Sequence, residues 1–216
     1  MKAELMTEEH RLRDEIAAIS KSFYDRGLTH GTTGNISARL SSGDLLMTPT
    51  GSSLGALDPA RISKLSPTGQ HVDGDPPTKE SFLHAIMYER RADAGAVVHL
   101  HSPYAVAVSC RSDLNPADCM PPLTAYYVMR VGVLPVAPYY PPGDKALADA
   151  VGALAADHHA VLLANHGPVV AGQTLRSATD AAEELEETAK LFLMLEGKPL
   201  QLLTPDDVAT LRARFG

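Results

Sequence analysis

The stretch VVHLHSPYA, residues 97–105, places two histidines at the end of a short apolar run. Residues two apart on a β-strand point to the same face of the sheet, so His99 and His101 are predicted to lie side by side. Ser102 and Pro103 follow at once and are typical of a helix start. The stretch therefore predicts a buried strand that runs into a helix. It leaves open whether the histidines bind a metal or are ordinary polar residues on a solvent-exposed face of the sheet.

Outward from this stretch, predicted strands and helices alternate along the chain. Apolar residues spaced by three or four predict an amphipathic helix over 7–27, and the longest helix is predicted over 175–196. A further helix is predicted after Thr78, its expected N-cap. The segment 111–130, rich in proline and tyrosine, is predicted to be irregular. The acidic run EELEE, residues 183–187, is predicted to be a solvated helix face.

The chain has 216 residues and a net charge of −7, which argues against a general nucleic-acid or anionic-membrane binder. An anionic small substrate is compatible with this charge, because a local site can be cationic inside an acidic protein. The cysteines, Cys110 and Cys119, do not make a disulfide framework, and the charged N-terminus lacks an apolar leader segment. We therefore expect a cytoplasmic protein that binds neither nucleic acid nor membrane.

The alternation of strands and helices lacks strict βαβ regularity. We accordingly predict an α/β fold in a single domain, residues 1–216, with three αβα layers. The central sheet is expected to be mixed and largely antiparallel, with helices on both faces.

A third histidine, His166, lies where the apolar run in LLANHGPVV breaks at a Gly-Pro turn. Three neutral imidazoles at strand ends can form an open metal site that leaves positions for water or substrate. Such a ligand set suits Zn²⁺, while Mn²⁺, Co²⁺ and Fe²⁺ remain open. His84 lies four residues after Glu80 on the same helix face, which is compatible with ligation, although a packed or supporting role is the simpler interpretation.

Three segments predict a site that binds an anion through hydroxyl groups and main-chain N–H groups. Two of them are turns that combine glycine with hydroxyl side chains, and the third is the start of a helix. These are THGTTGNIS (29–37), TPTGSS (48–53) and TKE (78–80), where Lys79 adds a mobile positive charge. Each alone is more simply a plain turn, but together they favour a phosphate or carboxylate site. Glu80 is a candidate acid or base. A proton donor is also conceivable among four tyrosines, although packing is the simpler role for each: Tyr126, Tyr127, Tyr139 and Tyr140.

The motifs HGTTGNIS, TPTG, a glutamate before a helix, HLH and NHG, in this order, resemble the class II aldolase/adducin family over nearly the whole chain. The resemblance implies one divalent metal per subunit, usually zinc, bound by His99, His101 and His166. Glu80 would be both a metal neighbour and a proton-transferring group. Contacts to a substrate phosphate would come from Thr33, Gly34, Asn35, Thr50 and Gly51. The family also implies a homotetramer with active sites at subunit interfaces, and Tyr126 is our candidate for a proton donor from the adjacent subunit.

Within the family, GDPPTKE, PPLTAYYVMR, PYYPPGD and VLLANHGPVVAG are most similar to the branch that decarboxylates 3-oxo-tetronate 4-phosphate. This implies metal-dependent loss of CO₂ through an enediolate, giving dihydroxyacetone phosphate in four-carbon sugar-acid catabolism. Thr78 and Lys79 stand where aldolases of the family often carry two serines, and Lys79 could pair with a substrate carboxylate.

Two alternatives remain at this point. A class II sugar-phosphate aldolase or epimerase, of the fuculose or ribulose phosphate type, would use the same enediolate. A non-catalytic adducin-like binding module is the other, and the complete set of His99, His101, His166 and Glu80 argues against it.

Overall fold

A computed structural model of the chain describes residues 7–141 and 143–215. Its strands form one eight-stranded sheet in the order β4-β3-β2-β1-β5-β8-β7-β6. Strands β6 and β7 pair in parallel, and the other neighbours are antiparallel. The strands are β1 (Asn35–Arg39), β2 (Leu45–Met47), β3 (Ser63–Leu65), β4 (His71–Asp73), β5 (Ala96–His99), β6 (Val136–Ala137), β7 (Ala160–Leu163) and β8 (Gly167–Gly172).

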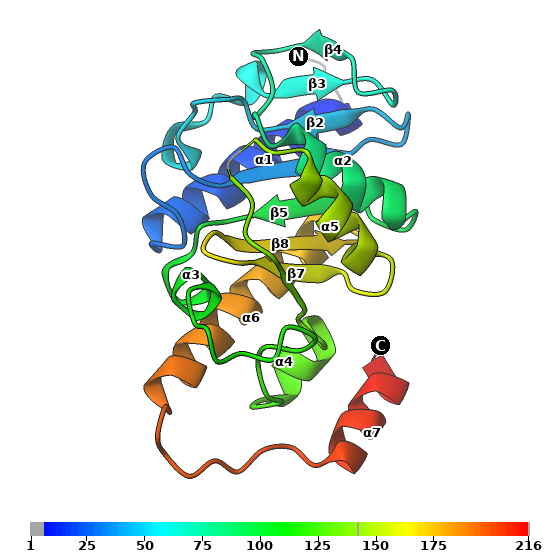
Figure 1. Cartoon of the computed structure of the whole chain (residues 1–216). Coiled ribbons are helices and arrows are strands. Elements are labelled where there is room, and N and C mark those ends of the chain that lie inside the picture. Colours follow the sequence, from blue (N-terminus) through cyan, green and yellow to red (C-terminus); the bar gives the residue numbers. More distant parts are fainter. Residues whose placement is uncertain (1–6, 142, 216) are drawn as a thin grey trace.

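Helices cover both faces of this sheet (Figure 1). The α-helices are α1 (Glu8–Asp25), α2 (Ser81–Arg90), α3 (Pro103–Ser109), α4 (Ala125–Arg130), α5 (Ala146–Ala155), α6 (Leu175–Met194) and α7 (Pro205–Phe215). Two short 3-10 helices, η1 (Leu54–Ala56) and η2 (Pro59–Arg61), connect β2 to β3. Within the described residues, none of these helices is both long and apolar enough to cross a membrane.

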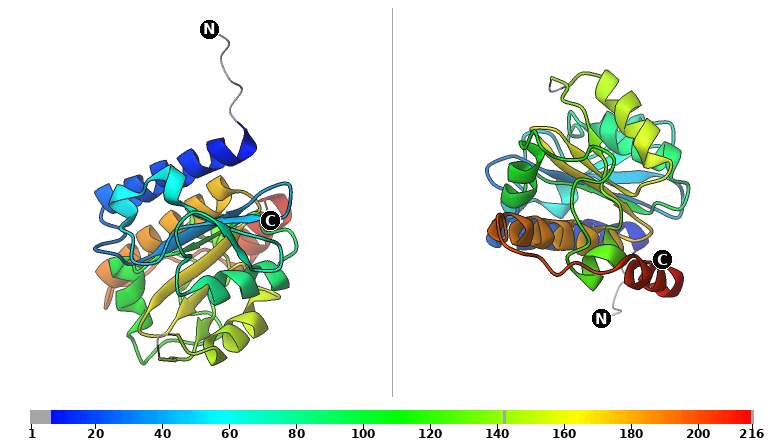
Figure 2. Two further views of the ribbon diagram at one scale, coloured as in Figure 1. Left: turned by 90° about the horizontal axis from the view of Figure 1, so that it is seen from above. Right: turned by 60° about the horizontal axis from the view of Figure 1, so that its bottom comes forward.

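Alternate residues of the central strands divide the core into two apolar layers, as the two-residue period of a strand requires. Val98 and Val170 belong to the layer that contains the buried residues of α1, α3 and α6. Val97 and Val169 belong to the layer with α2 and α5. The views in Figure 2 show these helix groups on opposite sides of the sheet. The predicted three-layer αβα fold with a mixed, largely antiparallel sheet is therefore confirmed.

The segment predicted to be irregular contains a helix, α4. The hydroxyl of Thr124 accepts a hydrogen bond from the main-chain N–H of Tyr127 at 3.1 Å and so caps the helix start. The prediction is wrong here because six helical residues are too few to show a periodic pattern among prolines and aromatic residues. Helix α4 packs against α6 and α7.

The acidic run EELEE is not a solvated face throughout. Glu186 is 4% exposed, and its two carboxylate oxygens accept hydrogen bonds from the main-chain N–H groups of Tyr104 (2.9 Å) and Ala105 (2.8 Å). These donors lie in the first turn of α3, where N–H groups have no partner within the helix and a negative charge is favoured. The prediction is wrong for this residue because the acidic pattern of one helix does not show which other helix begins beside it.

The turn before α2 also differs from the prediction. The helix begins at Ser81, after Glu80, so Thr78 is not its N-cap. The Thr78 hydroxyl instead accepts a hydrogen bond from the main-chain N–H of Glu80 at 3.3 Å. This contact tightens the turn that places Glu80 beside His99 at the end of the central strand β5.

Candidate metal centre and cavity

The three predicted histidines meet at one end of the sheet. Strand β5 ends at His99, His101 lies two residues further along, and His166 lies in the turn between β7 and β8. Antiparallel pairing of β5 with β8 places this turn beside the end of β5. Gly167 allows the close approach, because a Cβ at this position would lie 2.3 Å from the Leu100 carbonyl oxygen.

The donor atoms of these histidines and of Glu80 face one another. The Nε2 atom of His101 lies 3.1 Å from the Nε2 atoms of both His99 and His166. The Glu80 carboxylate oxygens lie 3.5 Å from His99 Nε2 and 3.3 Å from His166 Nε2. Ligand atoms about 2.0–2.1 Å from a tetrahedral zinc ion are about 3.3 Å from one another. The spacing of the four side chains therefore fits one divalent metal ion.

Local contacts prepare these groups for metal binding. The Nδ1–H of His99 donates to the Pro168 carbonyl oxygen at 2.9 Å, which leaves the Nε2 lone pair facing the cluster. Burial lowers the pKa of His99, and burial together with the neighbouring histidines lowers that of His101 to about 3. Burial raises the pKa of Glu80, but His99, His166 and Asn35 outweigh it and hold that pKa well below its usual range. Neutral imidazoles and an ionised carboxylate are the metal-binding forms.

The cluster opens into a cavity of about 490 Å³, lined by His30, Glu80, His101, Pro103, Val106, Tyr139, Tyr140, Asn165 and His166. This size suits a small molecule rather than a macromolecule. His30, Tyr139 and Tyr140 are the site residues that sequence reasoning missed or left as packing. The signal for His30 was its place directly before Gly31 in the glycine-rich turn THGTTG.

The predicted phosphate-binding residues lie in two places. Thr33 and Gly34 follow His30 in its turn, and a Cβ at Gly34 would lie 3.2 Å from the His99 carbonyl oxygen. Thr50 and Gly51 line a separate cavity of about 240 Å³. The N–H of Thr50 donates to the Pro76 carbonyl oxygen at 2.9 Å, so this loop lies against the segment that leads to Glu80.

Asn35, Thr78 and Lys79 lie at the edge of the metal cluster. The amide nitrogen of Asn35 donates to Glu80 Oε2 at 2.7 Å and to the Thr78 hydroxyl at 3.3 Å. A phosphate would have to compete with these groups for the Asn35 amide. Lys79 is exposed, directly before Glu80.

Tyr126 is not among the residues that line the metal cavity of its own chain. Its side chain is 59% exposed on α4, and the Arg130 guanidinium lies 5.4 Å from the centre of its ring. A contact of Tyr126 with a metal site therefore requires a second subunit.

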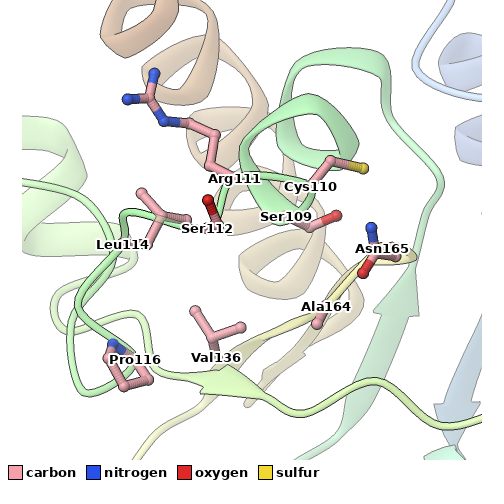
Figure 3. Close-up of a pocket in the computed structure, with 9 residues that line it drawn as sticks. All are labelled: Ser109, Cys110, Arg111, Ser112, Leu114, Pro116, Val136, Ala164 and Asn165. Atoms are coloured by element: carbon pink, nitrogen blue, oxygen red, sulfur yellow. The ribbon is translucent and has the colours of Figure 1, made fainter.

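Another cavity, of about 320 Å³, lies beside Ala164 and Asn165, which follow β7 (Figure 3). Asn165 borders both cavities and has a left-handed backbone conformation, with φ of 56°. The Ser109 carbonyl oxygen accepts from the Asn165 N–H at 3.1 Å, and the Ser109 hydroxyl accepts from the His166 N–H at 3.3 Å. The last residue of α3 thus holds in place the turn that contains His166.

Comparison with known proteins places this site in a family. The model of the class II aldolase and adducin N-terminal domain matches residues 14–193. The 3-oxo-tetronate 4-phosphate decarboxylase of Escherichia coli K12 is 48% identical over 205 residues, which cover 95% of this chain and 97% of that protein. The crystal structure of YgbL from Escherichia coli superimposes with a TM-score of 0.93 at 47% identity, over 95% of this chain and 100% of that one. The 5-deoxy-D-ribulose 1-phosphate aldolase of Bacillus thuringiensis serovar kurstaki is 34% identical over 94% of both chains.

Proposed function

We propose a function on the premise that this chain belongs to the class II aldolase and adducin family, as its matches over most of its length show. The function is metal-dependent decarboxylation of 3-oxo-tetronate 4-phosphate to dihydroxyacetone phosphate and CO₂. The observation that carries it is the set of four donor atoms at the mouth of a small cavity, in a chain 48% identical to such a decarboxylase. We take residues 1–216 to form a single domain.

His99, His101 and His166, with Glu80, would hold one divalent ion per subunit. We favour Zn²⁺ because the ligands are mostly imidazole, and the same donors also accept Mn²⁺, Co²⁺ or Fe²⁺. When bound, the ion supplies a Lewis acid that draws electron density from the 3-oxo group. The protein itself contributes the ionised Glu80 carboxylate, which lies among the three imidazoles and is suited to moving a proton.

Loss of CO₂ leaves an electron pair on C2 of the substrate, and this carbon must take up a proton. We assign this proton transfer to Tyr126, whose hydroxyl carries a proton, or to Glu80 once its carboxylate has taken up a proton from solvent. Because Tyr126 does not line the cavity of its own chain, it would act in a homotetramer whose active sites lie between subunits.

We assign the two charged ends of the substrate to the surrounding turns. Thr33, Gly34, Asn35, Thr50 and Gly51 would receive the phosphate through hydroxyl, amide and main-chain N–H groups. Thr78 and Lys79 would receive the carboxylate, because the exposed Lys79 ammonium directly precedes Glu80. A carboxylate is the group that a ketose phosphate, the substrate of an aldolase, lacks.

The reaction can be tested with protein loaded with Zn²⁺ and assayed for CO₂ release from 3-oxo-tetronate 4-phosphate, in parallel with aldol cleavage of ketose 1-phosphates. We expect CO₂ release to dominate, to stop on chelation and to be lost in His99→Ala. His71→Ala is the matched control, because His71 is exposed on edge strand β4 and should leave the rate unchanged. Faster cleavage of a ketose 1-phosphate would assign the protein to the aldolases.

The metal content of the purified protein tests the non-catalytic alternative, and the mass of its assembly tests the role of Tyr126. Elemental analysis should find about one divalent ion per chain in the purified protein, whereas a protein without bound metal would favour a binding module. Light scattering should give the mass of a tetramer, and a monomer with full activity would rule out Tyr126 as a donor from a partner subunit.

A further inference from the structure

Four side chains beneath the metal cluster form a continuous series of hydrogen bonds that ends at Glu80. The Tyr88 hydroxyl lies 2.9 Å from the Ser37 hydroxyl, which lies 2.7 Å from His84 Nδ1. His84 Nε2 lies 2.5 Å from Asn35 Oδ1, and the Asn35 amide nitrogen lies 2.7 Å from Glu80 Oε2. We call Tyr88, Ser37, His84 and Asn35 the buried relay.

The buried relay follows from the register of β1 and from the turn spacing of α2. Asn35 and Ser37 are two apart on β1 and pair with His99 and Val97 of β5, so both side chains point toward α2. His84 and Tyr88 lie four and eight residues after Glu80, on one side of the α2 segment. Two residues of the strand therefore interleave with two of the helix.

The direction of every hydrogen bond in the buried relay follows from Glu80, the carboxylate at which the relay ends. An ionised carboxylate can only accept, so Asn35 must turn its amide nitrogen toward Glu80 and its oxygen toward His84. His84 then carries its hydrogen on Nε2, and Nδ1 accepts from the Ser37 hydroxyl. The Ser37 oxygen accepts in turn from Tyr88. His84 has no exposed surface, and its burial lowers its pKa to about 3, so the neutral ring this arrangement needs is the form present.

Packing alone does not account for these residues. Burying hydroxyl, imidazole and amide groups costs free energy unless each finds a partner, and apolar side chains would fill the space between β1 and α2 without that cost. Leu83 and Met87 of the same helix are equally buried and belong to the apolar layer that contains Val97 and the buried residues of α5. Glu80, in contrast, makes no side-chain hydrogen bond to the start of α2, so contacts from elsewhere must set the position of its carboxylate.

We propose that the buried relay is a positioning device that holds the Glu80 carboxylate among the three histidines, and that His84 is the residue on which it depends. Without the His84 donor, the Asn35 amide keeps only the 3.3 Å contact to the Thr78 hydroxyl, which can donate as well as accept. The amide could then turn and present its oxygen to Glu80, which would repel the carboxylate. This inference extends the proposed function, but it concerns the geometry of the metal ligands and holds whichever substrate is used.

The test compares Zn²⁺ affinity, measured by competition with a chromophoric chelator, with kcat and KM for CO₂ release. We expect His84→Leu to raise the Kd for Zn²⁺ about tenfold or more, the range found when a partner of a metal ligand is removed, and to lower kcat more than it raises KM. His84→Gln retains an amide donor toward Asn35 and should restore most of the affinity. Tyr88→Phe removes the hydroxyl at the end of the relay farthest from Glu80 and leaves the hydrogen bonds from Ser37 to Glu80 in the same direction. The Kd of this variant for Zn²⁺ should therefore stay within about twofold of wild type.

Met87→Ala is the matched control for a general loss of packing, because Met87 is fully buried on the same helix and lies outside the relay. It should lower the denaturation midpoint without changing the Kd for Zn²⁺. If His84→Leu does not fold, Ser37→Ala takes its place, since it frees His84 Nδ1 and should raise the Kd at least threefold. Wild-type affinity in whichever of these two variants folds would overturn the proposal. An equal loss in Met87→Ala would also overturn it. A changed Kd in a protein that does not release CO₂ would instead contradict the proposed function alone.

Discussion

Glu186 offers a quantitative test of how helix α3, which begins two residues after the metal-site residue His101, is held. Its carboxylate accepts two main-chain hydrogen bonds, from Tyr104 and Ala105, at 2.9 and 2.8 Å, and the side chain is 4% exposed. A hydrogen bond to a charged group contributes about 1.5–3 kcal/mol, and burial prevents water from replacing it. Glu186→Ala should therefore lower the free energy of unfolding by about 3–6 kcal/mol. Glu186→Gln retains one acceptor oxygen and should lose about half of that amount.

The assay is urea unfolding followed by circular dichroism, at one protein concentration and with saturating Zn²⁺. Glu187 is the matched control, because its side chain is 67% exposed and forms a 3.8 Å ion pair with Lys190. Glu187→Ala should change stability by less than about 1 kcal/mol. Helix α3 begins two residues after His101, so Glu186→Ala should also weaken Zn²⁺ binding. Equal stabilities of the Glu186 and Glu187 variants would refute the role of Glu186 as a cap for α3.

Three further predictions concern the same end of the molecule. Gly167→Ala should abolish stoichiometric Zn²⁺ binding, measured by elemental analysis, because its Cβ would lie 2.3 Å from the Leu100 carbonyl oxygen; a normal metal content would contradict this. In the folded metal-free protein the pKa of His101 is about 3, against 6.5 for an ordinary histidine. Between these two pH values, this histidine is therefore protonated more often in the unfolded chain than in the folded protein. Stability measured by urea at several pH values should therefore fall as the pH drops from about 6.5 toward 3, by up to about 1.4 kcal/mol per pH unit for this group, and a flat profile would exclude the effect. A thiol reagent should modify the exposed Cys110 in the native protein and spare Cys119, whose burial raises its thiol pKa to about 12; mass spectrometry would reveal any modification of Cys119 before unfolding.

The amino-acid sequence by itself determined the features that depend on local pattern. Apolar spacing predicted the long helix α1, the helix predicted over 175–196 is α6, and the apolar run before His99 predicted strand β5. The spacing of His99 and His101, with His166 at a second strand end, predicted the cluster that the structure brings within ligand distance. These features could be predicted because the period of a helix or strand is set by its own backbone.

The tertiary structure alone decided how polar groups of different elements pair. From the sequence alone, Glu186 is predicted to lie on a solvated helix face, and only the packing of α3 beside α6 shows that its carboxylate is buried. The sequence predicts Asn35 only as a phosphate contact, and the register of β1 against β5 adds its contacts to Glu80 and His84. The physical reason is that a slip of one residue in strand register reverses the face of every side chain, and no short turn joins β1 to β5 to set their register locally. The residues of the metal site could thus be listed from the sequence, whereas the hydrogen bonds that orient them arise when the sheet and its helices pack together.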